Sequence, residues 1–122
     1  MIDNRPLSPH LSIHKKVSTA VFSIFHRFTG ITLTIGSFFI VLWIAMIALG
    51  PNYFAMIKAI SSNFLFKFLL FIWTIGIFYH LFNGIRYLYW SFGIGMNLKS
   101  VHFSAYIVLI LTFFSSIAIW LI

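Results

Sequence analysis

Long apolar stretches separated by short polar segments dominate the chain. The apolar stretches run over about 18–49, 64–90 and 102–122, and each reaches the roughly 20 residues that a helix needs to cross a bilayer. Gly50 and Pro51, which disfavour a continuing helix, follow the first stretch. The pattern predicts an all-α integral membrane protein with three transmembrane helices.

The polar segments predict the rest of the organisation. Residues 1–17 are basic and contain prolines that disfavour a helix, so we expect a segment at the membrane surface, with a solvated tail as the alternative. They lack the apolar core of a cleavable signal peptide, and we expect none. We expect the connection 52–63 to be partly helical and to lie in the membrane interface. Residues 1–122 then form a single membrane-anchor domain.

The composition excludes several classes of protein. The chain is 61% apolar and 7% charged, with a mean hydropathy of +1.05, so a soluble domain of 122 residues would lack the charges to cover its surface. Asp3 is the only acidic residue, and the net charge is +7. Because the basic residues flank apolar stretches, they indicate the lipid bilayer as partner and no nucleic acid. The absence of cysteine excludes disulfides and iron–sulfur ligation by this chain.

The distribution of lysine and arginine predicts the orientation. With three spans and the N-terminus inside, six basic residues lie on the inner side and two on the outer side. The excess of basic residues on the inner side favours an N-terminus on the matrix or cytoplasmic side. The inner set is Arg5, Lys15, Lys16, Arg27, Arg86 and Lys99, and the outer set is Lys58 and Lys67.

His80 lies in the second apolar stretch, in the sequence F-Y-H-L-F-N-G-I-R-Y. An ionisable side chain within the membrane is costly and therefore indicates a functional site. Gly76, His80 and Gly84 follow at i, i+4 and i+8, so they share one helical face. Two explanations of the glycines stay open. One is close packing of a neighbouring helix, which the spacing alone favours, and the other is a broad flat group such as a porphyrin.

The first apolar stretch opens with a second polar group, in S-I-F-H-R-F-T-G. Ser23, His26 and Arg27 lie within about one helical turn and can converge on one ligand, although Arg27 can instead extend to the lipid headgroups. We expect one polar cluster at the inner leaflet, with His80 about 9 Å deeper than Arg86. Its members are Ser23, His26, Arg27, His80, Asn83 and Arg86.

These motifs combine into a wider resemblance. R-P-L-S-P-H-L near the N-terminus, S-I-F-H-R-F-T-G and H-L-F-N-G-I-R-Y occur in this order over nearly the whole chain. Together they resemble the cytochrome b large membrane-anchor subunit of succinate dehydrogenase, respiratory complex II. The resemblance implies a heteromeric helical bundle that anchors a flavoprotein subunit and an iron–sulfur subunit. It also implies that the chain, itself outside the catalytic head of the enzyme, helps to pass electrons from succinate oxidation to ubiquinone.

The resemblance further implies roles for single residues. His80 matches an axial ligand of haem b, Ser23 and Arg27 match residues of the ubiquinone site, and His26 matches a histidine near the haem propionates. At three positions the chain departs from the family, in which histidine, aspartate and tyrosine are usual: Tyr87, Ser91 and His14.

The chemistry of haem b agrees with these roles. Its propionates are anionic, and His26, Arg27 and Arg86 are the donors expected at that depth. We expect His26 to lie too close to the inner surface to reach the far face of a porphyrin held by His80. A second small membrane-anchor subunit is then expected to supply the other axial ligand.

Two alternative functions remain. The same machinery run in reverse forms the anchor of a quinol:fumarate reductase, and this chain does not set the direction. The other alternative is a non-enzymatic membrane subunit with an assembly or structural role, for example a subunit of a small channel. A channel favours polar residues along the full length of a helix, whereas here they gather at one leaflet. Both the bacterial and the mitochondrial inner membrane are compatible with the sequence.

Overall fold

The computed structural model of the chain describes residues 18–122, which form helices joined by short turns. The prediction of an all-α fold is confirmed, and no strand occurs in this range. The expected surface segment and His14 lie outside the described residues. The helices are α1 (Ser18–Ala48), α2 (Pro51–Ser62), α3 (Phe64–Ser91) and α4 (Leu98–Leu121).

Three of these helices, α1, α3 and α4, are long and apolar enough to cross a membrane, as predicted. The shortest of them, α4, has 24 residues. At 1.5 Å per residue it is about 36 Å long, which exceeds the roughly 30 Å of a bilayer's hydrocarbon core. The short helix α2 has 12 residues and extends only about 18 Å, so it does not span.

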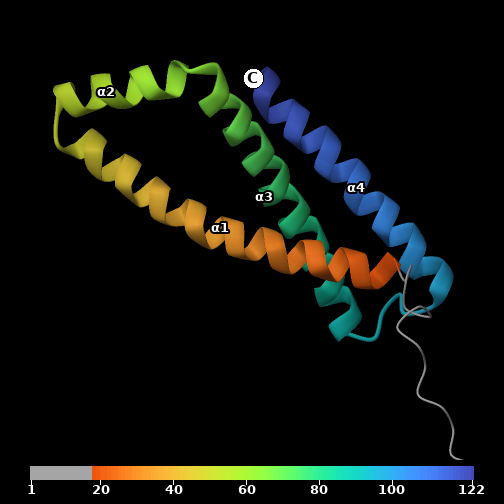
Figure 1. Cartoon of the computed structure of the whole chain (residues 1–122). Coiled ribbons are helices and arrows are strands. Elements are labelled where there is room, and N and C mark those ends of the chain that lie inside the picture. Colours follow the sequence, from red (N-terminus) through yellow and green to blue (C-terminus); the bar gives the residue numbers. More distant parts are fainter. Residues whose placement is uncertain (1–17) are drawn as a thin grey trace, which may run out of the picture.

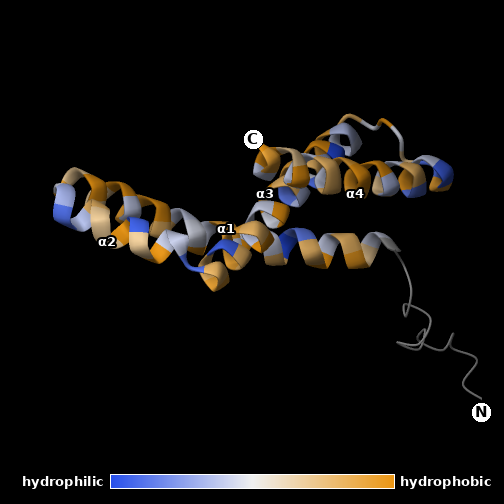
Figure 2. Cartoon of the chain, turned by 90° about the horizontal axis from the view of Figure 1, so that it is seen from above, coloured by the Kyte–Doolittle hydropathy of each residue, from blue (hydrophilic) through white to orange (hydrophobic). Residues whose placement is uncertain are grey.

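Helix α3 lies in the middle, with α1 packed on one side and α4 on the other (Figures 1 and 2). The N-terminal half of α1 crosses the C-terminal half of α3, and the two helices then separate. At the separated end α2 runs from one to the other (Figure 1). The connection expected to be partly helical is thus almost entirely helix, and it ties the divergent ends of α1 and α3 together.

Local sequence accounts for the helix ends. Gly50 adopts φ 117°, a conformation that side chains disfavour, and Pro51 begins α2 with its φ already suited to a helix. Asn63 caps α3 by accepting a hydrogen bond from the Leu65 amide (2.8 Å). Asn97 caps α4 in the same way. Its side chain accepts from the Ser100 amide (2.7 Å), so α4 begins at Leu98, four residues before the predicted start at about 102.

The buried side chains of α4 are small or medium-sized. The buried positions of α4 recur every three or four residues, which places them on the face toward α3. Small residues let membrane helices approach closely, where dispersion contacts stabilise the pair. The buried positions are Val101, Ala105, Val108, Thr112 and Ser116.

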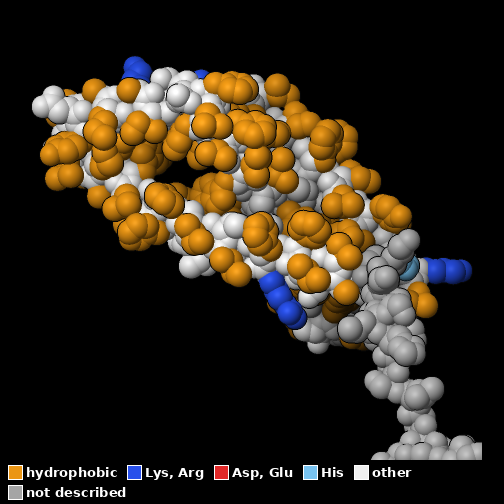
Figure 3. Space-filling model, in the orientation of Figure 1, with side chains coloured by type: hydrophobic (Ala, Val, Ile, Leu, Met, Phe, Trp, Pro, Cys, Tyr) orange, Lys and Arg blue, Asp and Glu red, His pale blue; other side chains and the backbone are white. Residues whose placement is uncertain are grey.

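Large apolar side chains cover much of the remaining surface. Phe38 and Phe39 of α1 are each 63% exposed, and Phe113 of α4 is 60% exposed. The space-filling view shows hydrophobic side chains over the spanning helices (Figure 3). Such an extended apolar surface needs lipid or other membrane helices around it.

Gly36 of α1 is in close contact with α3. The ring of Trp73 lies directly on Gly36, where a Cβ atom would overlap it. The Trp73 indole also donates to the carbonyl of Thr32 (3.3 Å). The absence of a side chain at Gly36 therefore lets the indole lie directly against the backbone of α1.

We expect Gly36→Ala to destabilise the α1–α3 packing, because overpacking a close contact typically costs about 1–3 kcal/mol. Gly76→Ala is the matched control on α3, since its added methyl group meets only Thr29 Cγ2 at 3.9 Å. The thermal midpoint of the purified protein in detergent should fall for Gly36→Ala and stay level or rise for Gly76→Ala. Equal midpoints for the two variants would show that the Trp73 contact does not limit the packing.

Candidate functional site

Two histidines from different spans meet where α1 crosses α3. The imidazoles of His26 and His80 stack with their centroids 4.1 Å apart and their planes 7° from parallel. The two helices therefore bring together residues that lie 54 positions apart in the sequence.

The hydrogen bonds of His80 define its tautomer. Its Nδ1 lies 3.1 Å from the carbonyl of His26 and 3.2 Å from the hydroxyl of Thr29. That hydroxyl itself donates to the same carbonyl (2.9 Å), so Nδ1 must carry the proton and donate. A neutral imidazole with its proton on Nδ1 keeps a lone pair on Nε2.

The Nε2 atom of His80 has no hydrogen-bond partner within residues 18–122, and it is not among the buried unpartnered atoms of that range. It is therefore not fully buried, and its lone pair is unpartnered in the described residues. An imidazole held through Nδ1–H by a backbone carbonyl is the arrangement that orients histidine toward a metal.

Glycines allow the helices to approach this closely. A Cβ on Gly30 would lie 3.1 Å from Cε1 of His80, and one on Gly84 would lie 3.6 Å from Nε2 of His26. Gly76 likewise faces Thr29. Of the two explanations left open by the spacing of Gly76 and Gly84, the structure supports the packing of a neighbouring helix.

The backbone of α1 provides a second point of attachment at Phe22. Its carbonyl accepts a hydrogen bond from the Tyr79 hydroxyl (2.9 Å) and a longer one from the Asn83 amide (3.5 Å). A helical carbonyl keeps a second lone pair, so it can accept from a neighbouring helix as well. Tyr79 and Asn83 are both buried, and Asn83 is completely so.

Arg86 is buried at the junction of the three spanning helices, with only 5% of its surface exposed. It donates to the Ser104 hydroxyl (2.9 Å), the Asn83 side-chain oxygen (3.2 Å) and the Val101 carbonyl (2.9 Å). Its guanidinium carbon lies 4.2 Å from the centre of the Trp90 ring. All of these partners are neutral, and residues 18–122 contain no carboxylate side chain. The positive charge is therefore buried without a counterion from the described chain.

Ser23 and Arg27 lie on the same stretch of α1 but are more open. Arg27 is exposed and Ser23 is partly exposed. Neither side chain makes a hydrogen bond within the described residues, so both are available to a ligand. The predicted cluster thus has a packed part, formed by His26, His80 and the Asn83–Arg86 pair, and this accessible part.

The structure corrects the expected depth of His26. We expected His26 to lie too close to the inner surface to reach the far face of a porphyrin held by His80. Instead, the two rings stack, so they lie at the same level. The prediction counted residues along separate helices, whereas α1 and α3 cross at an angle and bring both histidines to the crossing point (Figure 1).

One residue of the site, Thr29, was missed from the sequence, and Tyr87 was noted there only as a departure from the family. Thr29 bridges His80 and the His26 carbonyl, and its position within S-I-F-H-R-F-T-G, one turn after His26, is the signal that could have identified it. Tyr87 packs its ring edge-on against His26, with centroids 5.1 Å apart. The Tyr87 hydroxyl and His26 Nε2 are both buried without a partner in the described residues, which indicates a polar partner from outside residues 18–122.

Comparison with known proteins places these features in a family. Residues 1–119 match the model of the succinate dehydrogenase/fumarate reductase transmembrane subunit. The chain belongs to this family. Its relatives include a succinate dehydrogenase cytochrome b560 subunit from Reclinomonas americana, which is 37% identical over 98% of this chain and 86% of the relative.

Further relatives come from bacteria and from mitochondria. A succinate dehydrogenase cytochrome b556 subunit of Rickettsia bellii is 34% identical over 97% of this chain and 92% of the relative. A mitochondrial cytochrome b560 subunit of Sus scrofa is 36% identical over 95% of this chain and 70% of the relative. The chain is therefore a multi-pass membrane subunit of the succinate dehydrogenase cytochrome b type, as the motifs predicted.

The residues present fit one kind of cofactor better than others. Within residues 18–122 no three histidine or acidic side chains gather as ligands for a bare metal ion. A haem needs only one or two ligands from protein, because the porphyrin supplies the other four. The free Nε2 of His80, together with cationic and unpartnered polar groups nearby, suits an iron porphyrin with anionic substituents.

Proposed function

We propose that the chain is the haem b-binding membrane anchor of a succinate:ubiquinone oxidoreductase, with His80 as an axial ligand of the haem iron. The observation that carries the proposal is the state of His80. Its Nδ1–H is fixed by the His26 carbonyl, and its Nε2 is free and accessible. The relatives are named as cytochrome b subunits, which agrees with haem b as the cofactor.

Only one of the two axial ligands comes from this chain. His26 is stacked parallel to His80, face to face, so the two Nε2 atoms cannot point at one iron from opposite sides. The depth argument for excluding His26 was wrong, but ring geometry leads to the same result. A histidine from a second small membrane-anchor subunit completes the coordination, and the haem is shared between the two chains.

The cationic groups around the histidines are suited to the haem propionates. Arg86 is a buried cation without a carboxylate, and burying such a charge unpaired is costly. Three of its five N–H groups are used within the chain, which leaves two for an external anion. His26, with its unpartnered Nε2, and the exposed Arg27 provide further donors. When bound, haem b would carry one electron at a time, and the residues of the chain would hold and orient the haem.

Ser23 and Arg27 form the ubiquinone side of the site. The Ser23 hydroxyl donates to a quinone carbonyl, and Arg27 stabilises the negative charge that develops on the ring as electrons arrive. Both side chains are free of partners within the described residues and lie on the accessible surface of α1. An iron–sulfur subunit docks at this end and delivers electrons from a flavoprotein subunit that oxidises succinate.

The family description also covers fumarate reductase, so an anchor of a quinol:fumarate reductase is the second candidate. The same residues serve both directions, because the direction depends on the potentials of the redox partners. The relatives cited are succinate dehydrogenase subunits, which favours the first candidate. A purely structural membrane subunit leaves the buried unpaired Arg86 and the free His80 nitrogen without an explanation.

His80→Ala should remove the b-type spectrum of the assembled complex or convert it from low-spin to high-spin, because one axial ligand is lost. The reduced-minus-oxidised difference spectrum of the purified complex measures this. His102→Ala, on the exposed side of α4, is the control and should leave the spectrum intact. A normal low-spin spectrum in His80→Ala would rule out His80 as ligand.

Ser23→Ala and Arg27→Leu should lower succinate–quinone activity, by about 30- to 1,000-fold if each contact contributes the roughly 2–4 kcal/mol typical of such donors. Electron transfer from succinate to a soluble artificial acceptor should stay unchanged. Ser37→Ala is a matched control, since the Ser37 hydroxyl is already bonded to the Thr34 carbonyl. A parallel loss of both activities would point to faulty assembly, and no loss in either would place the quinone elsewhere.

The N-terminus should lie on the matrix or cytoplasmic side. In the structure Arg86 and the start of α4, which carries Lys99, lie at the end where α1 begins, whereas Lys58 belongs to α2 at the opposite end (Figure 1). Because the chain contains no cysteine, single variants Ser8→Cys and Lys58→Cys can be labelled directly in sealed vesicles. We expect an impermeant reagent to label Lys58→Cys from the outer side. Labelling of Ser8→Cys from that side would show that the N-terminus lies outside and that the predicted topology is wrong.

A further inference from the structure

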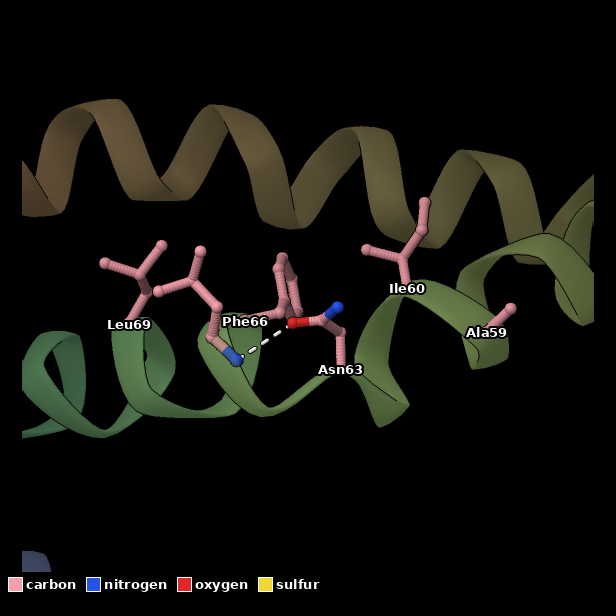
Figure 4. A pocket seen from close by; sticks show the side chains of 6 residues that line it. Ala59, Ile60, Asn63, Phe66 and Leu69 are labelled. Atoms are coloured by element: carbon pink, nitrogen blue, oxygen red, sulfur yellow. Dashed lines mark hydrogen bonds between the residues drawn. The ribbon is translucent and has the colours of Figure 1, made fainter.

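The two ends of the α1–α3 pair differ in their polar contacts. At the end beside α2, a hollow is lined by apolar side chains such as Ile60, Phe66 and Leu69, and the hydrogen bond drawn there is the Asn63 cap of α3 (Figure 4). At the crossing, by contrast, side chains of α3 bond to the main chain of α1. Thr29 is the side chain of α1 that takes part in this bonding.

The Thr29 hydroxyl makes two hydrogen bonds at His80. It donates to the His26 carbonyl of its own helix (2.9 Å) and lies 3.2 Å from Nδ1 of His80, and the same carbonyl lies 3.1 Å from that nitrogen. Because the Thr29 proton goes to the carbonyl, the hydroxyl oxygen accepts from Nδ1–H through a lone pair. The Nδ1 proton is thus shared between two acceptors. By comparison, the hydroxyls of Thr34 and Ser37 bond only to carbonyls of α1 itself.

Both branches of the Thr29 side chain are held in place. In a helix, a threonine hydroxyl that bonds the carbonyl three or four residues earlier selects one rotamer, and Thr29 uses the carbonyl three residues earlier. Its methyl group then lies toward Gly76 of α3, where an added Cβ would be 3.9 Å away. The oxygen of Thr29 is therefore presented to His80 in one position.

The imidazole of His80 meets two further contacts from the same segment of α1. Its face stacks on the His26 ring with centroids 4.1 Å apart, and a Cβ on Gly30 would come within 3.1 Å of its Cε1 atom. A rotation of the ring would break the shared hydrogen bond and the stacking together. Residues 26–30 therefore fix both the plane of the ring and the nitrogen that carries the proton.

We propose that Thr29 is a positioning residue for the haem ligand, whose hydroxyl holds the imidazole plane of His80 and accepts part of the hydrogen bond from Nδ1–H. This inference rests on the proposed role of His80 as an axial ligand. A hydrogen bond from the remote nitrogen raises the basicity of a ligating histidine. Hydrogen bonding around the axial ligands is also one of the means by which a protein sets the reduction potential of a haem. Thr29 thus acts on the haem through His80.

The test compares Thr29→Val with Thr29→Ser in the purified, assembled complex. Valine keeps the branched shape and removes the hydroxyl, whereas serine keeps the hydroxyl and removes the methyl group. Electron paramagnetic resonance of the oxidised haem reports the orientation of the axial imidazole planes through its largest g value, and a redox titration gives the midpoint potential.

We expect Thr29→Val to shift the largest g value and to raise the midpoint potential. The ring loses one of the two acceptors of its proton, so it is less firmly oriented and donates less to ferric iron. Thr29→Ser should match the unmodified complex in both measurements. Unchanged values in Thr29→Val, or the same shifts in Thr29→Ser, would overturn the proposal.

Thr34→Val is the matched control, because it removes an exposed hydroxyl of α1 that bonds only to the Gly30 carbonyl (3.0 Å). Its g value and potential should equal those of the unmodified complex. If Thr29→Val does not assemble, Thr29→Ala removes the same hydroxyl without the added methyl group. The same shifts are expected in Thr29→Ala, and their absence would refute the proposal.

His80→Ala separates this proposal from the proposed function. A normal low-spin spectrum in His80→Ala would remove the ligand role itself. Loss of that spectrum in His80→Ala, together with unchanged values in Thr29→Val, would leave His80 as the ligand and refute only the positioning role of Thr29.

Discussion

The buried guanidinium of Arg86 is the interaction on which the arrangement of the spanning helices depends. It touches all three: the Phe22 ring of α1 at 5.3 Å, Asn83 and Trp90 of α3, and Val101 and Ser104 of α4. Away from water, each unsatisfied donor costs several kcal/mol, so the cation can stay buried only while its acceptors keep their places. The start of α4 and the N-terminal half of α1 are therefore fixed against the C-terminal half of α3.

That constraint also determines what His80 can do. Once α1 is held against α3, its main chain becomes a row of acceptors, with Phe22 receiving Tyr79, His26 receiving His80 and Thr32 receiving Trp73. Backbone carbonyls of a helix move little, so they fix the rings of α3 more firmly than mobile side chains would. The proton of His80 is directed to one of these carbonyls, and its other nitrogen is left without a partner in the described residues. A ligand nitrogen prepared in this way loses little conformational entropy when it binds.

The helices and the members of the site were readable from the sequence, whereas their mutual positions were not. Apolar length predicted three spans, and the spacing of His26, His80 and Arg86 predicted a cluster on neighbouring helix ends. The depth of His26 was wrong because depth along one helix says nothing of the crossing angle with another. Arg86 was expected at the inner surface, and its inward direction depends on Val101 and Ser104, which lie in a helix that offered no polar motif. The role of Thr29 could not be predicted because it depends on which nitrogen of His80 carries the proton, and only the hydrogen-bond geometry defines that.

The contrast between the two ends of α1 follows from the same residues. Along its N-terminal half, glycines and backbone acceptors bring α1 against α3, and the ring of Trp73 lies directly on Gly36. Beyond it α1 carries large exposed side chains such as Phe38 and Phe39, and the two helices lie apart (Figure 1). The helix α2 joins the two separated ends (Figure 1). A rigid polar end can hold a cofactor in fixed geometry, while an open apolar end can adapt to the lipids and helices around it.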